Sequence, residues 1–187
     1  MKSGIKQQIV IGGVGGQGVL FVTRLLAEAA MRNGCAVLTS ETHGMAQRGG
    51  TVVSHLKIGN YHSPMIRSGQ ADGLIALKGE IAGTFASFLR PGAWMTVNSN
   101  RPIVPAGDTC ITCLDADNIA MAAGYPQSVN LVMLGFALAV IEQKRIENLC
   151  TLTDIRAVME NRLKEKPQLL ESSLAALMSG YEAKGLA

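Results

Sequence analysis

The sequence predicts an α/β fold: a Rossmann-like, open and mostly parallel sheet with helices on both faces and a helical C-terminal part. Near the N-terminus a buried strand, a glycine loop, a helix and a second strand follow one another, which is how a parallel sheet begins. In the last third, apolar residues recur at helical spacing almost without interruption. Because 187 residues are little more than one average domain, we expect a single domain over residues 1–187.

Short apolar or alternating runs, bounded by turn residues, predict the strands of this sheet. They fall at residues 7–12, 35–39, 51–58, 73–77, 94–98 and 109–114. The run at 51–58 alternates, with Val52, Leu56 and Ile58 on one face and His55 and Lys57 on the other, so we expect a half-exposed strand. Residues 101–107 contain two prolines and are expected to form a loop.

Helical spacing predicts six helices. They cover residues 19–32, 80–89, 117–123, 131–143, 154–163 and 167–178. Asn33-Gly34 is suited to end the first of them, because glycine adopts the left-handed conformation of a helix C-terminus. We expect Asn130 and Thr153 to be N-caps, and Pro167 to occupy the first turn of the last helix, which would end at Gly180.

Composition excludes several classes of protein. Hydrophobic residues make up 48% and charged residues 17%, which is incompatible with intrinsic disorder. The net charge of +3 (17 − 14) is small, and aromatic residues make up 4%, so neither favours nucleic acid as a partner. The longest apolar run, at 131–141, is shorter than the roughly 20 residues of a membrane span, and the N-terminus does not resemble a signal peptide. We therefore expect a cytoplasmic protein without a membrane partner, whose four cysteines are free thiols.

A first glycine motif lies between the first strand and the first helix. Gly13, Gly15 and Gly18 satisfy the pattern G-x-G-x-x-G, in which glycines let the backbone approach a phosphate at a helix N-terminus. By itself this pattern is weak evidence for a dinucleotide, because Glu41, the acidic residue nearest the expected ribose position, belongs to another motif. The loop could bind a dinucleotide, another phosphate or a partner subunit, or only pack the strand against the helix.

A second motif follows the second predicted strand, at the carboxyl edge where α/β sheets bind ligands. It reads Glu41-Thr42-His43-Gly44-Met45-Ala46-Gln47-Arg48-Gly49-Gly50. An acid, an imidazole, an amide and a guanidinium among glycines favour a binding function, since glycines imply close backbone approach or positive φ. The alternative is that Arg48 pairs with Glu41 and stiffens a loop.

Together the two motifs, with Ser54-His55, resemble the gamma-type subunit of 2-oxoacid:ferredoxin oxidoreductases. The likeness extends over nearly the whole chain, through residues 61–64, 71–77 and 91–92, Asn130 with Gly135, and residues 174–181. Within this family the sequence is most similar to the small subunits of enzymes that act on indolepyruvate. Either glycine motif alone would be weak evidence, and their combination is specific.

The resemblance implies an enzyme complex of anaerobic metabolism. Such a complex oxidatively decarboxylates a 2-oxoacid, here indolepyruvate or another aryl pyruvate, forms an acyl-CoA and CO₂, and reduces ferredoxin. Thiamine diphosphate, Mg²⁺ and [4Fe–4S] clusters would be in a larger alpha subunit, the expected partner, with CoA as a co-substrate and no cofactor in this chain. This chain would complete the complex and wall the approach of substrate and CoA. Isolated, we expect it to be inactive, and it could form a homodimer.

The residues themselves agree that this chain holds no cluster. An iron–sulfur cluster takes four cysteine ligands, whereas this sequence has one Cys-x-x-Cys pair, Cys110 and Cys113. On the predicted strand these two positions point to opposite faces, so we expect no metal site.

The site residues follow as hypotheses. We expect cofactor or anion binding at the first motif, by Gly13, Gly15, Gly16, Gln17 and Gly18. We expect substrate or CoA binding at Glu41, Gln47, Arg48, Gly49, Gly50 and Ser54. Arg48 is the best candidate for a bidentate clamp on a carboxylate or phosphate, and His43 could hydrogen-bond a carbonyl, both in supporting catalytic roles. Glu41 would orient one of them, and His62 is expected at the surface.

Two other functions remain open at this point. The chain could be a free-standing nucleotide-binding enzyme of Rossmann type, or a structural assembly module without a ligand. The segment from Gly44 to Gly50 favours the subunit over a simple dehydrogenase, which has no need of it.

Overall fold

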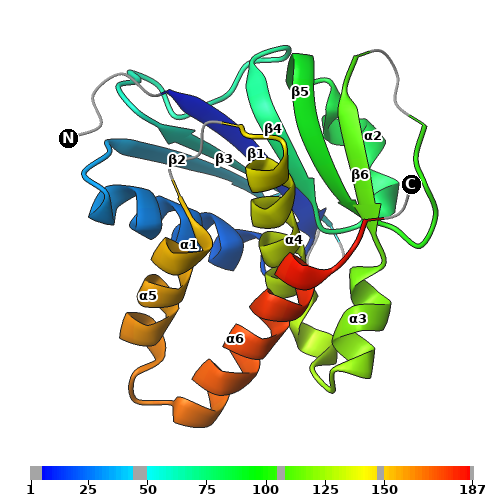
Figure 1. Cartoon of the computed structure of the whole chain (residues 1–187). Helices are drawn as coiled ribbons and strands as arrows, with labels where there is room; N and C mark the ends of the chain where they lie inside the picture. Colours follow the sequence, from blue (N-terminus) through cyan, green and yellow to red (C-terminus); the bar gives the residue numbers. More distant parts are fainter. Residues whose placement is uncertain (1–5, 44–49, 105–107, 147–149, 186–187) are drawn as a thin grey trace.

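The computed structural model describes residues 6–43, 50–104, 108–146 and 150–185. Six strands form one open sheet in the order β2-β3-β1-β4-β5-β6 (Figure 1). The strands are β1 (Gln7–Val14), β2 (Val37–His43), β3 (Thr51–Ile58), β4 (Ala71–Ala76), β5 (Leu89–Asn98) and β6 (Cys110–Leu114). Strand β3 is antiparallel to both β1 and β2, and the pairs β1–β4, β4–β5 and β5–β6 are parallel. The predicted α/β class with a mostly parallel sheet is therefore confirmed.

Helices cover both faces of this sheet. They are α1 (Val19–Arg32), α2 (Gly79–Ala86), α3 (Ala116–Ala122), α4 (Val129–Gln143), α5 (Leu152–Leu163) and α6 (Pro167–Glu182), with a 3₁₀ turn at Pro126–Ser128 before α4. Helices α1, α3, α4, α5 and α6 lie on one side of the sheet, and α2 lies on the other (Figure 1). Two hydrophobic cores result. One lies between the sheet and the side that contains α1 and α4, and the other lies between the sheet and α2. None of the described helices is long and apolar enough to span a membrane.

Helix α4 is the centre of the helical side. Its residues from Leu131 to Ile141 are all buried, because the sheet and neighbouring helices surround it. It crosses α6 at two glycines. A Cβ on Gly180 would lie 2.6 Å from the Val132 carbonyl carbon, and one on Gly135 would lie 2.9 Å from the Tyr181 amide nitrogen. Glycine at both positions is thus what lets the two backbones touch, and α6 continues through Gly180 rather than ending there.

The second strand ends later in the sequence than predicted. Strand β2 runs to His43, so Glu41 and His43 belong to the strand instead of following it. It is paired with β3 from Val37 opposite Ile58 to His43 opposite Val52, and β3 separates it from β1. The first two strands of the chain are therefore not direct neighbours in the sheet. Polar residues are accommodated in β2 because it is an edge strand with one side in solvent.

The half-exposed strand at 51–58 is also wrong. Ser54 and His55 are 0% and 1% exposed, and Lys57 is 8% exposed. An alternating pattern predicts a solvent-exposed face only where no other element covers that face of the strand. Here the His55 ring packs edge-on against Phe88, with 5.1 Å between ring centroids. Strand β3 is also paired on both sides, so neither edge is exposed.

Several element ends differ by a few residues. Thr151, not Thr153, caps α5, and its side chain and that of Asp154 form a reciprocal capping box. Asn130 lies inside the first turn of α4, after the 3₁₀ turn, and is not its N-cap. Strand β5 begins at Leu89, so Pro91 and Gly92 are in an exposed strand end rather than a break. Gly34 and Gly124, with φ of 76° and 79°, follow α1 and α3 as expected.

Candidate functional site

The first glycine motif joins β1 to α1 in a tight turn. Gly16 and Gly18 have φ of 96° and 79°, a conformation that other residues rarely adopt. Gly18 is also the N-cap of α1, and its Cβ would overlap the Asn130 side chain. A Cβ on Gly13 would lie 2.6 Å from Val19 Cγ2. The motif therefore needs glycine for backbone conformation at two positions and for close packing at a third.

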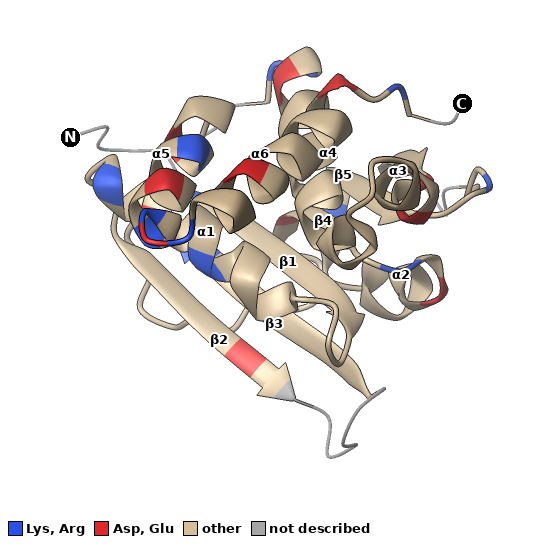
Figure 2. Ribbon diagram, turned by 90° about the horizontal axis from the view of Figure 1, so that it is seen from below, with Lys and Arg blue, Asp and Glu red and all other residues tan. Residues whose placement is uncertain are grey.

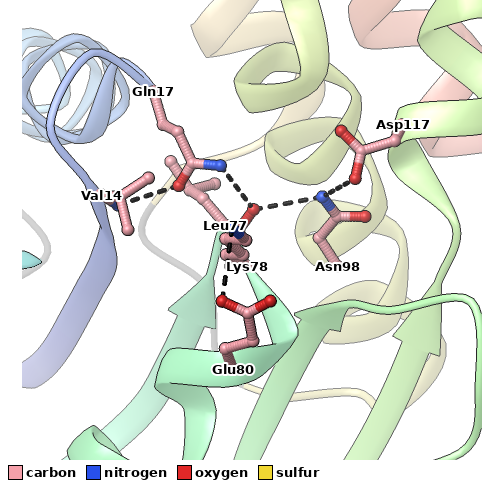
Figure 3. A network of polar contacts seen from close by, with 7 residues as sticks. All are labelled: Val14, Gln17, Leu77, Lys78, Glu80, Asn98 and Asp117. Atoms are coloured by element: carbon pink, nitrogen blue, oxygen red, sulfur yellow. Dashed lines mark hydrogen bonds and ion pairs between the residues drawn. The ribbon is translucent and has the colours of Figure 1, made fainter. Parts of the chain in front are cut away.

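The Gln17 side chain fixes this loop to the neighbouring strand ends (Figure 3). Its Oε1 accepts a hydrogen bond from the Val14 amide at 2.9 Å, and its Nε2 donates to the Leu77 carbonyl at 3.4 Å. Asn98 Nδ2 donates to the same carbonyl at 3.1 Å and to Asp117 Oδ2 at 2.9 Å. The carboxyl ends of β1, β4 and β5 are thus joined by one polar network.

The second motif contacts the first through Gly50. The Gly15 amide donates to the Gly50 carbonyl at 2.8 Å. The strands that flank the second motif are also in register there, with Val14 opposite Thr51 and His43 opposite Val52. The described ends of the second motif, at His43 and Gly50, therefore lie at the same edge of the sheet as the glycine loop, and Gly50 contacts Gly15.

A hollow of about 460 Å³ lies in front of the glycine loop. Its lining includes Gly15, Gly16, Gly18, Val52, Arg24 and Arg162. The first turn of α1 contains no acidic residue, and Gly18 provides no side-chain cap, so its positive end faces the hollow without a carboxylate from the helix itself. Basic and acidic residues both occur where α1 lies beside α5 (Figure 2). An anion is the ligand that this arrangement favours.

The two arginines that line the hollow differ in whether they form an ion pair with another described residue. Arg162 Nε pairs with Glu28 Oε2 at 2.6 Å, so its charge is partly neutralised. Arg24 is exposed, and none of the ion pairs among the described residues includes it. Sequence reasoning missed both. Arg24 could have been found as the cation nearest the start of the first helix, whereas Arg162 comes from a distant helix and leaves no local signal.

The structure brings only part of the predicted site together. Gly15, Gly16 and Gly18 line the hollow, whereas Gly13 and Gly50 are not among its lining residues. The Gly15 amide already donates to the Gly50 carbonyl, and the Gln17 side chain is bonded within the protein. Glu41 is exposed on β2 opposite Ser54. Ser54 is fully buried, its Oγ has no hydrogen-bond partner in the described part of the chain, and it does not line the hollow. Gln47, Arg48 and Gly49 lie outside the described residues, so their roles stay predictions.

The other titratable groups lie away from the hollow. Burial, and then the charge of Lys57, lowers the pKa of His55, which keeps this imidazole neutral at pH 7. His62 is exposed, as expected. None of the four cysteines, all of them described, forms a disulfide, and burial raises the pKa of Cys113 and, to about 12, that of Cys150. Within the described ranges no three His, Cys, Asp or Glu side chains are grouped as a metal site would need.

Comparison with known proteins gives a consistent result. A family model described as pyruvate ferredoxin/flavodoxin oxidoreductase matches residues 8–183. The chain is 33% identical over 197 residues to the indolepyruvate oxidoreductase subunit IorB of Archaeoglobus fulgidus, with 95% of this chain and 94% of that one covered. It is 29% identical over 195 residues to subunit IorB of Methanothermobacter thermautotrophicus, covering 94% and 96% of the two chains.

Solved structures with the same fold are similar to it over nearly its whole length. The gamma subunit of a keto/oxoacid ferredoxin oxidoreductase from Geobacter sulfurreducens superimposes with a TM-score of 0.75 at 24% identity, covering 94% of this chain and 96% of that one. A 2-oxoglutarate:ferredoxin oxidoreductase from Magnetococcus marinus, with 2-oxoglutarate, coenzyme A and succinyl-CoA bound, gives a TM-score of 0.76 at 18% identity and covers 95% of this chain and 31% of that one. At these identities the likeness shows the fold alone.

Proposed function

The chain belongs to the pyruvate ferredoxin/flavodoxin oxidoreductase family, and from this premise we propose that it is the small subunit of an indolepyruvate:ferredoxin oxidoreductase. The complex would decarboxylate indolepyruvate or another aryl pyruvate, transfer the acyl group to CoA, release CO₂ and pass two electrons to ferredoxin. The relatives named IorB support this substrate, because each of the two compared above is matched over almost its full length.

The contact between the Gly15 amide and the Gly50 carbonyl is the observation that most supports a ligand-facing role. It joins the two glycine motifs at the carboxyl edge of the sheet, where α/β proteins bind ligands. In this proposal the free end of α1, the Gly16 and Gly18 amides and Arg24 bind an anionic group, a CoA phosphate or the substrate carboxylate. Gln17 keeps the loop in shape from behind rather than touching the anion.

The second motif would supply the groups that face the substrate. Arg48 would clamp a carboxylate or phosphate, assisted by Gln47 and Gly49, and His43 would hydrogen-bond a carbonyl. Glu41 would orient one of these side chains. All are supporting roles, since the chemistry of decarboxylation and electron transfer belongs to cofactors.

In this proposal thiamine diphosphate, Mg²⁺ and the [4Fe–4S] clusters would be in the larger subunit. The donor groups of this chain support that placement. Cys110 and Cys113 are both on β6, three positions apart, and Cys113 is buried. Thiamine diphosphate, when bound in the larger subunit, would supply the carbanion chemistry, and this chain would wall the path to it.

The test is anaerobic purification of the tagged chain from its native cells, with the tag alone as a control. The expected result is a larger iron–sulfur and thiamine-binding subunit in equal amount, and CoA-dependent reduction of viologen by indolepyruvate. A chain that is recovered alone and binds a nicotinamide nucleotide would overturn the proposal.

The anion role of the hollow has its own test within that complex. Arg24→Gln should raise the KM for CoA about tenfold if this hollow binds a CoA phosphate, because one exposed charge contact is lost. Arg101→Gln removes an exposed cation from the loop after β5 and is the matched control. Equal KM values in the two variants would show that the phosphate binds elsewhere.

A further inference from the structure

A second cavity, of about 510 Å³, lies at the other end of β1 and β3 from the glycine loop. It opens between the start of β1, the end of β3 and the segment that leads to β4, and its lining includes Gln8, Lys57, Tyr61, His62, Arg67 and Ser68. Gln8 and Lys57 are paired across the two strands, whereas the glycine loop follows Val14. Six residues of strand separate the two places, which is roughly 20 Å.

Lys57 is the unusual residue of this cavity. Its side chain is recessed, with the residue only 8% exposed, yet it lines the cavity. None of the ion pairs formed by the described residues includes Lys57. Its Nζ lies over the Tyr61 ring, 5.0 Å from the centroid, and Lys6 Nζ lies 5.4 Å from the same centroid. A buried lysine normally has an anionic partner, because burial without one disfavours its charge.

The surroundings of Lys57 add positive charge instead of neutralising it. Arg67 lines the same cavity, and among the described residues no Asp or Glu does. Asp72 is nearby on β4, but it accepts hydrogen bonds from the Gln8 amide at 2.7 Å and from Arg90 Nε at 2.7 Å. Burial, and then the charge of Arg67, lowers the pKa of Lys57. Lys57 and Arg67 thus line one cavity that has no acid among its described lining residues.

We propose that this cavity is a binding site for a phosphate group, held by Lys57 and Arg67 with the hydroxyl of Ser68 as a further donor. A phosphate group has a charge of about −1.5 to −2 at pH 7, which matches the two cations. Because Lys57 is recessed, the group must enter the cavity, which favours a small molecule over an acidic protein surface. The volume is in the range of small-molecule pockets, about 300–1,000 Å³. The site is separate from the glycine loop and does not depend on the function of that loop.

The experiment is a titration of the isotope-labelled full chain with inorganic phosphate, at ionic strength held constant with sodium chloride. It follows the Lys57 side-chain resonances and the backbone amides around the cavity by NMR. A parallel titration with glycerol 3-phosphate, and with glycerol as its control, distinguishes free phosphate from a phosphate ester. We expect saturable shifts at this cavity and movement of the Lys57 titration to higher pH. Tighter binding of glycerol 3-phosphate would identify an ester, and equal binding would identify free phosphate.

Variants separate this site from others. Lys57→Met keeps the apolar stem, and Arg67→Gln removes the charge of an exposed side chain. Each should weaken phosphate binding at this cavity at least tenfold, while Arg101→Gln, in the loop after β5, should leave it unchanged. Shifts that do not saturate, or that persist in both cavity variants, would overturn the proposal. Loss of binding in Arg24→Gln alone would place the phosphate at the glycine loop and would overturn it equally.

Discussion

Replacing Gly180 by alanine tests the close packing of α6 against α4. The new Cβ would lie 2.6 Å from the Val132 carbonyl carbon, against an optimal carbon–carbon separation of about 3.5–4.0 Å, so α4 and α6 must separate by roughly 1 Å. Overpacking of this kind costs about 1–3 kcal/mol, and the upper end applies because the obstacle is backbone. The higher helix propensity of alanine returns about 1 kcal/mol. The net effect is about 2 kcal/mol of destabilisation.

Thermal unfolding followed by circular dichroism measures this effect. For a chain of this size about 2 kcal/mol lowers Tm by about 4–8 °C. Gly83→Ala is the matched control, because Gly83 is in α2 and its Cβ would meet nothing within 4 Å. That variant should gain about 1 kcal/mol and unfold about 2–4 °C higher. A Gly180→Ala protein as stable as Gly83→Ala would refute the close crossing of α4 and α6.

Three further predictions concern single sites. Gly18→Ala should lower the free energy of unfolding in urea more than Gly16→Ala does. Both glycines have positive φ, which costs another residue about 1–2 kcal/mol, but only at Gly18 would the new Cβ also meet a side chain, that of Asn130. Equal losses would argue against this contact. In the same assay Thr151→Ala should lower the free energy of unfolding by about 1 kcal/mol and Thr153→Ala should hardly change it, because only Thr151 caps α5. A larger loss in Thr153→Ala would favour Thr153 as the cap, as the sequence predicted. The pKa of Cys150 is about 12 in the folded chain and about 8.5 in the unfolded chain. Above pH 8.5 the thiol ionises only in the unfolded chain, so the free energy of unfolding falls by about 1.4 kcal/mol per pH unit, whereas below pH 8.5 the contribution of this thiol is fully present. Cys150→Ala should flatten the fall of unfolding free energy between pH 9 and 10.5, and unchanged slopes would show that this thiol is not responsible.

Local patterns predicted most of the fold because they report local physics. The run at 7–12, the glycine turn and the apolar spacing from Val19 gave β1 and α1 within two residues. The insertion of β3 between β1 and β2 could not be predicted in this way, since strand order depends on long-range pairing. The burial of His55 depends on Phe88, a residue more than thirty positions away, and alternation alone contains no such information.

The site was predicted in part for the same reason. Its glycines are recognisable because positive φ and close approach leave a residue-type signal at Gly16 and Gly18. The cations Arg24 and Lys57 have no such signal, because their importance comes from what surrounds them in space. The inward bonding of Gln17 was likewise invisible, since it depends on the Leu77 carbonyl of a neighbouring strand.

The central claim is that the two glycine motifs of this subunit serve the active complex and not only its assembly. The most direct measurement is kcat of the purified complex with Arg48→Ala, compared with Arg101→Gln, alongside the subunit ratio of each preparation. Loss of a bidentate charge contact of about 2–4 kcal/mol predicts a fall in kcat of about 30- to 1,000-fold, with the complex assembled in equal yield. An Arg48→Ala complex with full turnover, or one that fails to assemble at all, would contradict this account.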